Sequence, residues 1–181
     1  MMTKRFKDDY EIVVTTDEAG REKEEAVYLG EYFQVALDEE GLRSFKRKSL
    51  LLAAAAAVLH IAAGFISNWG MYQVYVVFPY VFVFFPLLYL VDGILYLPRE
   101  QRAYRRDEVE LSFGRMKVTS RIVLALLCVG ALGEVIFLLL FMGDGKLVFE
   151  ALFFVLEVLA AGAVYMLIRL QKDFCIENAE Q

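Results

Sequence analysis

The sequence predicts an all-α integral membrane protein: four transmembrane helices in an antiparallel bundle, preceded by a small cytoplasmic β-hairpin-like segment. Hydrophobic residues make up 59% of the 181 residues, and the mean hydropathy is +0.48, whereas soluble domains contain about 45 to 50% apolar residues. The apolar residues also gather in four runs, at about 49–67, 74–96, 122–142 and 147–168. Since about 20 apolar residues cross a hydrocarbon layer of about 30 Å, each run is long enough to span a bilayer.

Composition also excludes several classes of protein. The excess of apolar residues argues against soluble globular, fibrous and disordered chains. A disulfide-stapled secreted domain is excluded because the only cysteines are Cys128, inside the third run, and Cys175, in the tail. The stretch before the first run shows no signal-peptide pattern. The chain is therefore expected to be a multi-pass protein of the cell membrane.

Lysine and arginine near the runs predict the orientation, because these residues are enriched in cytoplasmic loops. They precede the first run, crowd the loop 97–121 and follow the fourth run, whereas the connections 68–73 and 143–146 contain only Lys146. Both termini and the long loop are therefore predicted to be cytoplasmic.

Three regions follow from this pattern: a cytoplasmic segment 1–46, a bundle 47–170 and a cytoplasmic tail 171–181. In the first, Tyr10–Thr16 and Glu25–Leu37 are rich in β-branched and aromatic residues and are separated by a turn, which predicts a hairpin and allows a third short strand. So short a segment buries little core alone. We expect it to rest on the membrane-proximal loops or on a second copy.

The loop 97–121 carries the signature of a basic amphipathic helix. Val109, Phe113 and Met116 recur at helical spacing, and such a helix suits an anionic membrane surface. The basic residues that would contact lipid headgroups are Arg102, Arg105, Arg106, Arg115 and Lys117. The alternative is that these charges only fix topology on a solvated linker.

Small residues predict where the helices touch. The first run holds five consecutive alanines from Ala53 and the fourth holds Ala160–Ala163, and small residues let helix backbones approach closely in lipid. Short connections favour pairing of the first run with the second and of the third with the fourth. Such faces, with the undersized hairpin, predict a homo-oligomer or a complex with another membrane protein.

The ionisable residues inside the runs are the candidate functional residues, because a charge in hydrocarbon is costly. His60, Glu134 and Glu157 lie 12 or 13 residues from the cytoplasmic basic residues of their runs and are flanked by small residues, which predicts one hydrogen-bonded layer within the bundle. One interpretation is polar contacts that fix helix register. The other is a proton or cation site.

Asp92 and Glu150 are secondary polar positions. Asp92 lies close enough to the cytoplasmic end to reach the headgroups or Arg99, and Glu150 lies one turn from Lys146 near the outer surface. Neither position requires a function.

Known catalytic and cofactor motifs are absent from the sequence. One histidine with two carboxylates lacks the spacing of a metal site. We therefore expect no enzyme, no metal, no cofactor and no nucleic-acid partner.

Two function classes remain after these exclusions. The first is a binding, scaffold or accessory subunit that acts through its cytoplasmic face. The second is an oligomeric proton- or cation-linked transporter or channel that uses the predicted His/Glu layer. The first is preferred because no run shows a continuous polar stripe.

Overall fold

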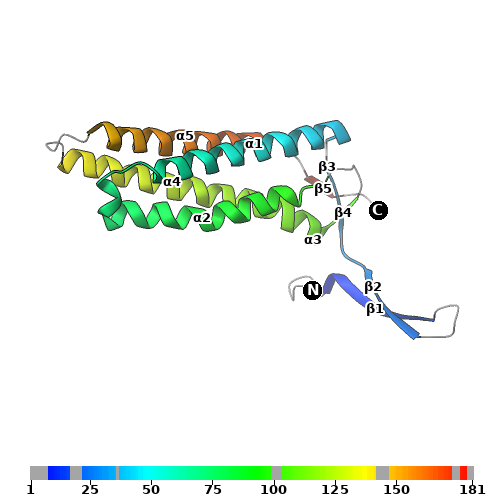
Figure 1. The fold of residues 1–181 in the computed structure, drawn as a ribbon. Coiled ribbons are helices and arrows are strands. Elements are labelled where there is room, and N and C mark those ends of the chain that lie inside the picture. Colours follow the sequence, from blue (N-terminus) through cyan, green and yellow to red (C-terminus); the bar gives the residue numbers. More distant parts are fainter. Residues whose placement is uncertain are drawn as a thin grey trace.

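The computed structural model describes residues 8–16, 22–35, 37–98, 103–141, 147–172 and 176–178. Its main body is a bundle of four long helices that lie side by side (Figure 1). They are α1 (Glu39–Gly64), α2 (Val74–Leu95), α4 (Arg115–Leu140) and α5 (Leu147–Lys172). All four are long and apolar enough to cross a membrane. The predicted bundle of four long apolar helices is thereby confirmed.

Two short elements extend α4 at its start, and short strands gather at one end of the bundle. The helical turn α3 (Arg106–Val109) and the π-helical turn η3 (Glu110–Gly114) lead directly into α4. Strand β3 (Tyr32–Val35) is the centre of an antiparallel sheet, with β4 (Tyr104–Arg105) on one side and β5 (Ile176–Asn178) on the other. We call this end of the bundle the sheet end (Figure 1).

The opposite end of the bundle, which we call the turn end, holds the connection between α1 and α2. A 3-10 turn, η2 (Gly70–Tyr72), forms part of this connection. Helix α2 starts from this connection and agrees closely with the predicted run 74–96, since it begins at Val74 and ends at Leu95.

Strands β1 (Tyr10–Thr16) and β2 (Glu22–Tyr28) form the predicted N-terminal hairpin. The hairpin extends away from the bundle beyond the sheet end (Figure 1). The second apolar stretch does not continue as one strand, since the chain leaves strand geometry between Tyr28 and Tyr32. The third strand therefore belongs to the other sheet.

Helix α1 begins before the apolar run, because Asp38 caps it. The Asp38 carboxylate accepts a 2.8 Å hydrogen bond from the Gly41 amide, and Glu39 and Glu40 occupy the positive first turn. Helix α1 therefore includes the basic stretch that leads into the first apolar run. Helix α2 runs unbroken through Pro79 and Pro86.

The most extensive helix contacts join α2 with α4 and α1 with α5, whereas α1 and α2 touch little. The expected pairing of the third run with the fourth is present as an extensive α4–α5 contact, whereas the expected pairing of the first run with the second is weak. Small residues explain the observed pairs. A Cβ added at Gly133 would lie 2.8 Å from the Tyr75 carbonyl oxygen, so α4 can approach α2 this closely only with glycine there. Ala53, Ala56 and Ala160 are buried in the same core cluster.

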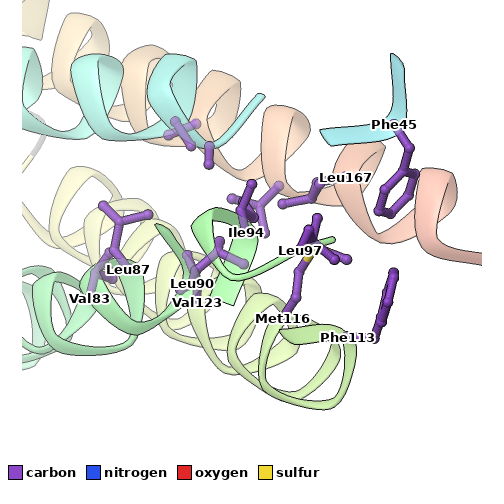
Figure 2. Packing of buried hydrophobic residues seen from close by; sticks show 14 of the residues in the cluster. Phe45, Val83, Leu87, Leu90, Ile94, Leu97, Phe113, Met116, Val123 and Leu167 are labelled. Atoms are coloured by element: carbon purple, nitrogen blue, oxygen red, sulfur yellow. The ribbon is translucent and has the colours of Figure 1, made fainter. Parts of the chain in front are cut away.

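That core fills the bundle from its middle to the sheet end, where side chains from both helix pairs meet (Figure 2). The Phe113 ring lies 6.4 Å from the Phe45 ring, and Met116 is 2% exposed. The predicted amphipathic helix is thus real, but its apolar face packs against protein. Contact between the basic residues of this segment and lipid headgroups stays a prediction.

Candidate functional site

The bundle contains a buried carboxyl partner for its single histidine. His60 on α1 and Glu157 on α5 are 1% and 3% exposed, and His60 Nδ1 lies 2.8 Å from Glu157 Oε1. His60 Nε2 lies 3.1 Å from the carbonyl oxygen of Tyr80 on α2. The Tyr80 and Phe84 rings also flank the imidazole, at 4.3 and 4.9 Å between ring centres. His60 therefore joins α1, α2 and α5.

Hydrogen-bond chemistry fixes the proton on one side of His60. A carbonyl oxygen only accepts, so Nε2 carries hydrogen and donates to Tyr80. The Nδ1 contact then takes one of two forms: protonated Glu157 donates to neutral imidazole, or imidazolium donates to carboxylate. Either form holds one proton between the two groups and leaves the pair with no net charge. That neutrality lowers the cost of burying it.

Glu134 lies apart from this pair, in a second polar group at the turn end. Its side chain is 0% exposed, and both carboxyl oxygens lack a hydrogen-bond partner among the described residues. A Cβ at Gly70 would lie 3.0 Å from the Glu134 carboxyl carbon, so the connection between α1 and α2 packs onto this carboxyl group. Glu134 also interacts with Glu150, although no oxygen of Glu134 meets hydrogen-bond geometry.

Glu150 is a buried residue of the bundle and not a surface group, and Lys146, its expected neighbour, lies outside the described residues. Glu150 is 4% exposed, and it accepts hydrogen bonds from the amides of Trp69, at 2.6 Å, and Gly70, at 3.3 Å. Its position seven residues before Glu157 on α5 places both carboxyl groups on one helix face. That spacing was the sequence signal for a role of Glu150 inside the bundle.

The predicted three-residue layer is therefore corrected to two groups. The structure brings His60 and Glu157 together, and it places Glu134 with Glu150 beneath the turn-end connection. A small apolar cluster of Ala63, Val76 and Phe153, with Tyr80 packed on it, fills part of the turn-end half of the bundle.

Apolar packing also closes the bundle on the other side of His60. From its middle to the sheet end, the interior is filled by the main core, which includes Val83, Leu87, Leu127 and Val164. These four side chains are at most 5% exposed. Among the described residues, apolar side chains therefore lie between the His60–Glu157 pair and the buried Ser49 and Ser120 near the sheet end. No group of three or more potential metal ligands occurs in the described ranges.

The remaining predicted site residues make ion pairs within the protein. Arg115 pairs with Asp92, which joins α4 to the end of α2, and Arg99, the expected partner, lies outside the described residues. Arg106 Nε lies 3.4 Å from Glu110 Oε1, and Arg105 Nη2 lies 3.8 Å from Glu108 Oε1. Lys117 is exposed, and Arg102 lies outside the described residues. Three of the five proposed lipid-binding cations thus already have carboxylate partners.

The base of the β1–β2 hairpin is fixed to the α3 turn by aromatic and polar contacts. The Tyr10 hydroxyl donates to Asp107 at 3.1 Å, and the Arg106 amide donates to the Tyr28 hydroxyl at 3.1 Å. The Arg105 guanidinium lies 5.9 Å from both ring centres. Burial, followed by the hydrogen bond to Asp107, raises the pKa of Tyr10. The hydroxyl therefore stays protonated and keeps donating at neutral pH.

Beyond this base, the hairpin exposes apolar side chains. Ile12 and Val14 lie on the same hairpin face as Tyr10, and they are 66% and 58% exposed. In the part of the chain that is described, β1 and β2 pair only with each other, so each keeps one free hydrogen-bonding edge. We call Ile12, Val14 and the two edges the hairpin surface. Sequence reasoning found the strands but not this exposure.

Comparison with protein-family models, with curated proteins and with solved structures found no match for this chain.

Proposed function

We propose that the chain is a multi-pass protein of the cell membrane that serves as a binding or accessory subunit, with the hairpin surface as its contact site on the cytoplasmic side. The observation that carries this proposal is the contrast between the hairpin and the bundle. The hairpin leaves Ile12 and Val14 open and both strand edges unpaired, whereas apolar side chains fill the bundle interior.

Membrane insertion is supported by the outward faces of the helices. Val58, Leu88 and Leu139 are 65%, 71% and 68% exposed, although each belongs to a helix of spanning length. Water-soluble monomers rarely expose apolar surface of this extent. The shared sheet β3–β4–β5 joins the N-terminal segment, the loop and the tail at one end. That arrangement agrees with both termini on the side rich in lysine and arginine.

Charge favours a protein partner for the hairpin surface over the bilayer. The two strands contain four acidic residues and one basic residue, Lys23. An acidic hairpin is repelled by an anionic cytoplasmic leaflet. A basic, extended segment of another membrane protein would match both the charge and the free strand edges. We propose such a segment as the partner.

Photocrosslinking in intact cells tests this proposal. A photoreactive amino acid in place of Ile12 is expected to give a crosslinked product that contains a second, different protein with a basic segment. The matched control is the same group in place of Leu139, which is equally exposed but faces outward from α4. Charge reversal by Glu11→Lys should lower the yield of the crosslink at position 12 by roughly tenfold, which corresponds to a loss of about 1.4 kcal/mol of binding free energy.

Three outcomes would contradict the proposal: no product at Ile12, a product that contains only a second copy of this chain, or equal products from Ile12 and Leu139. Variants with a single cysteine test which side of the membrane the turn end and the hairpin face. A cysteine replacing Tyr72, which is 81% exposed at the turn end, should react from outside the cell. One replacing Ile12 should react only after the cells are opened.

A second candidate function, proton or cation binding inside the bundle, is favoured by one observation. Glu134 is fully buried near Glu150, and neither of its oxygens makes a hydrogen bond of normal geometry with a described residue. Such a group normally requires a proton, a water molecule or an ion. Transport would need in addition a path through the packed core, and an oligomer would have to supply it.

A further inference from the structure

A groove between α1 and α5 opens at the sheet end of the bundle. It has a volume of about 640 Å³. Three cationic and four apolar residues line it: Lys48, Arg169, Lys172, Leu51, Leu52, Met166 and Leu170. None of these residues belongs to the basic set that the sequence assigned to lipid.

The cations of this groove differ from those of the loop in having no carboxylate partner. Among the described residues, Lys48, Arg169 and Lys172 make no ion pair, and all three are exposed. Arg105, Arg106 and Arg115, in contrast, are paired within the protein. The groove therefore combines cations that are free to receive an anion from outside.

Charge and hydrophobicity are ordered along the groove in the same sense on both helices. On α1, Lys48 is followed one turn toward the bundle middle by Leu51 and Leu52. On α5, Arg169 is preceded one turn toward the bundle middle by Met166. The three cations thus lie at the sheet end with Leu170 among them, and Leu51, Leu52 and Met166 lie deeper. A phospholipid has the same order, with a phosphate at the interface and acyl chains in the hydrocarbon.

We propose that this groove binds one anionic glycerophospholipid, with its phosphate among Lys48, Arg169 and Lys172 and an acyl chain along Leu51 and Met166. This inference rests on the membrane insertion proposed above. The last-turn cations of α5 also offset the negative helix C-terminus, but that role needs neither Lys48 nor an apolar wall.

Native mass spectrometry of protein taken from nanodiscs tests the inference. Nanodiscs contain phosphatidylcholine mixed with phosphatidylglycerol, and the retained lipids are counted for wild type and for the double variant Lys48→Gln/Arg169→Gln. Wild type should retain phosphatidylglycerol preferentially. The double variant should lose this preference by roughly tenfold or more, since each cation near the surface contributes about 1 kcal/mol.

The matched control is Arg47→Gln/Lys117→Gln, which removes two exposed cations outside the groove lining. This control should keep the preference. Equal loss in both double variants would overturn the inference, because the attraction would then be diffuse. Retention of phosphatidylglycerol by the groove variant would overturn it as well.

Two further measurements distinguish lipid binding from binding of free phosphate, and failure of the groove proposal from failure of the membrane proposal. Glycerol phosphate, which has no acyl chain, should not displace the retained phosphatidylglycerol, and displacement would contradict a lipid site. Failure of the protein to enter nanodiscs would refute the membrane proposal. Entry without any lipid preference would refute the groove alone.

Discussion

Replacing His60 with alanine is expected to lower the free energy of unfolding by about 4 kcal/mol, because it opens a cavity and leaves a buried carboxyl group unpaired. The imidazole fills the space between the Tyr80 and Phe84 rings. Its Nδ1 also lies 2.8 Å from Glu157 Oε1, and its Nε2 lies 3.1 Å from the Tyr80 carbonyl oxygen. Alanine removes all of these contacts at once.

The matched variant Glu157→Gln should change stability by less than about 1 kcal/mol. The glutamine amide can donate to Nδ1 of neutral His60, so the hydrogen bond survives without a charge. Unfolding in detergent, followed by thermal melting and by denaturant titration, measures both variants. If Glu157→Gln were as destabilising as His60→Ala, the pair would need its ionised form, and the form in which protonated Glu157 donates to neutral imidazole would be excluded.

Replacing Gly133 with alanine should destabilise the bundle by about 2 kcal/mol, because the added Cβ would meet backbone. Pro79 lacks an amide hydrogen, so the carbonyl oxygen of Tyr75, four residues earlier, loses its helical donor. This oxygen would lie 2.8 Å from the new Cβ. A backbone atom cannot rotate away as a side chain can, so α2 and α4 would have to move apart.

Gly162→Ala is the control for this substitution. A Cβ at Gly162 meets nothing within 4 Å, so alanine there should stabilise α5 by up to about 1 kcal/mol through its higher helix propensity. The two variants are compared by the same thermal unfolding measurement. Equal effects at Gly133 and Gly162 would show that α2 and α4 are not in close contact at this position.

Hydrophobic length predicted that four long helices exist, because span length depends on local composition, but α1 and α4 begin at Glu39 and Arg115, before their apolar runs. The run 74–96 gave α2 (Val74–Leu95) almost to the residue. Helix order was not predictable in the same way. Short connections bring helix ends together, but backbone approach at Gly133 decides that α2 packs mainly on α4.

The sequence predicted one part of the candidate site and missed another. Small neighbours correctly indicated that His60 and Glu157 point into protein, and the structure joins them. Counting residues gave Glu134 a similar depth, but it could not show that the connection at Trp69 and Gly70 folds onto the turn end. That connection gives Glu150 its partners.

The loop helix shows the limit of periodicity. Phe113 and Met116 recur at helical spacing, and the segment is helical. Periodicity alone does not tell whether an apolar face meets lipid or protein. The Phe45 ring of α1 settles the question, because it packs on Phe113 (Figure 2).

Ion flux through reconstituted vesicles tests the proposal that the bundle conducts no ions and that the protein acts through the hairpin surface. Proton, sodium and potassium leak are compared for wild type, Glu157→Gln and protein-free vesicles. We expect all three preparations to leak at the same rate, because apolar cores lie on both sides of the His60–Glu157 pair. Flux in wild type that disappears in Glu157→Gln would contradict the proposal.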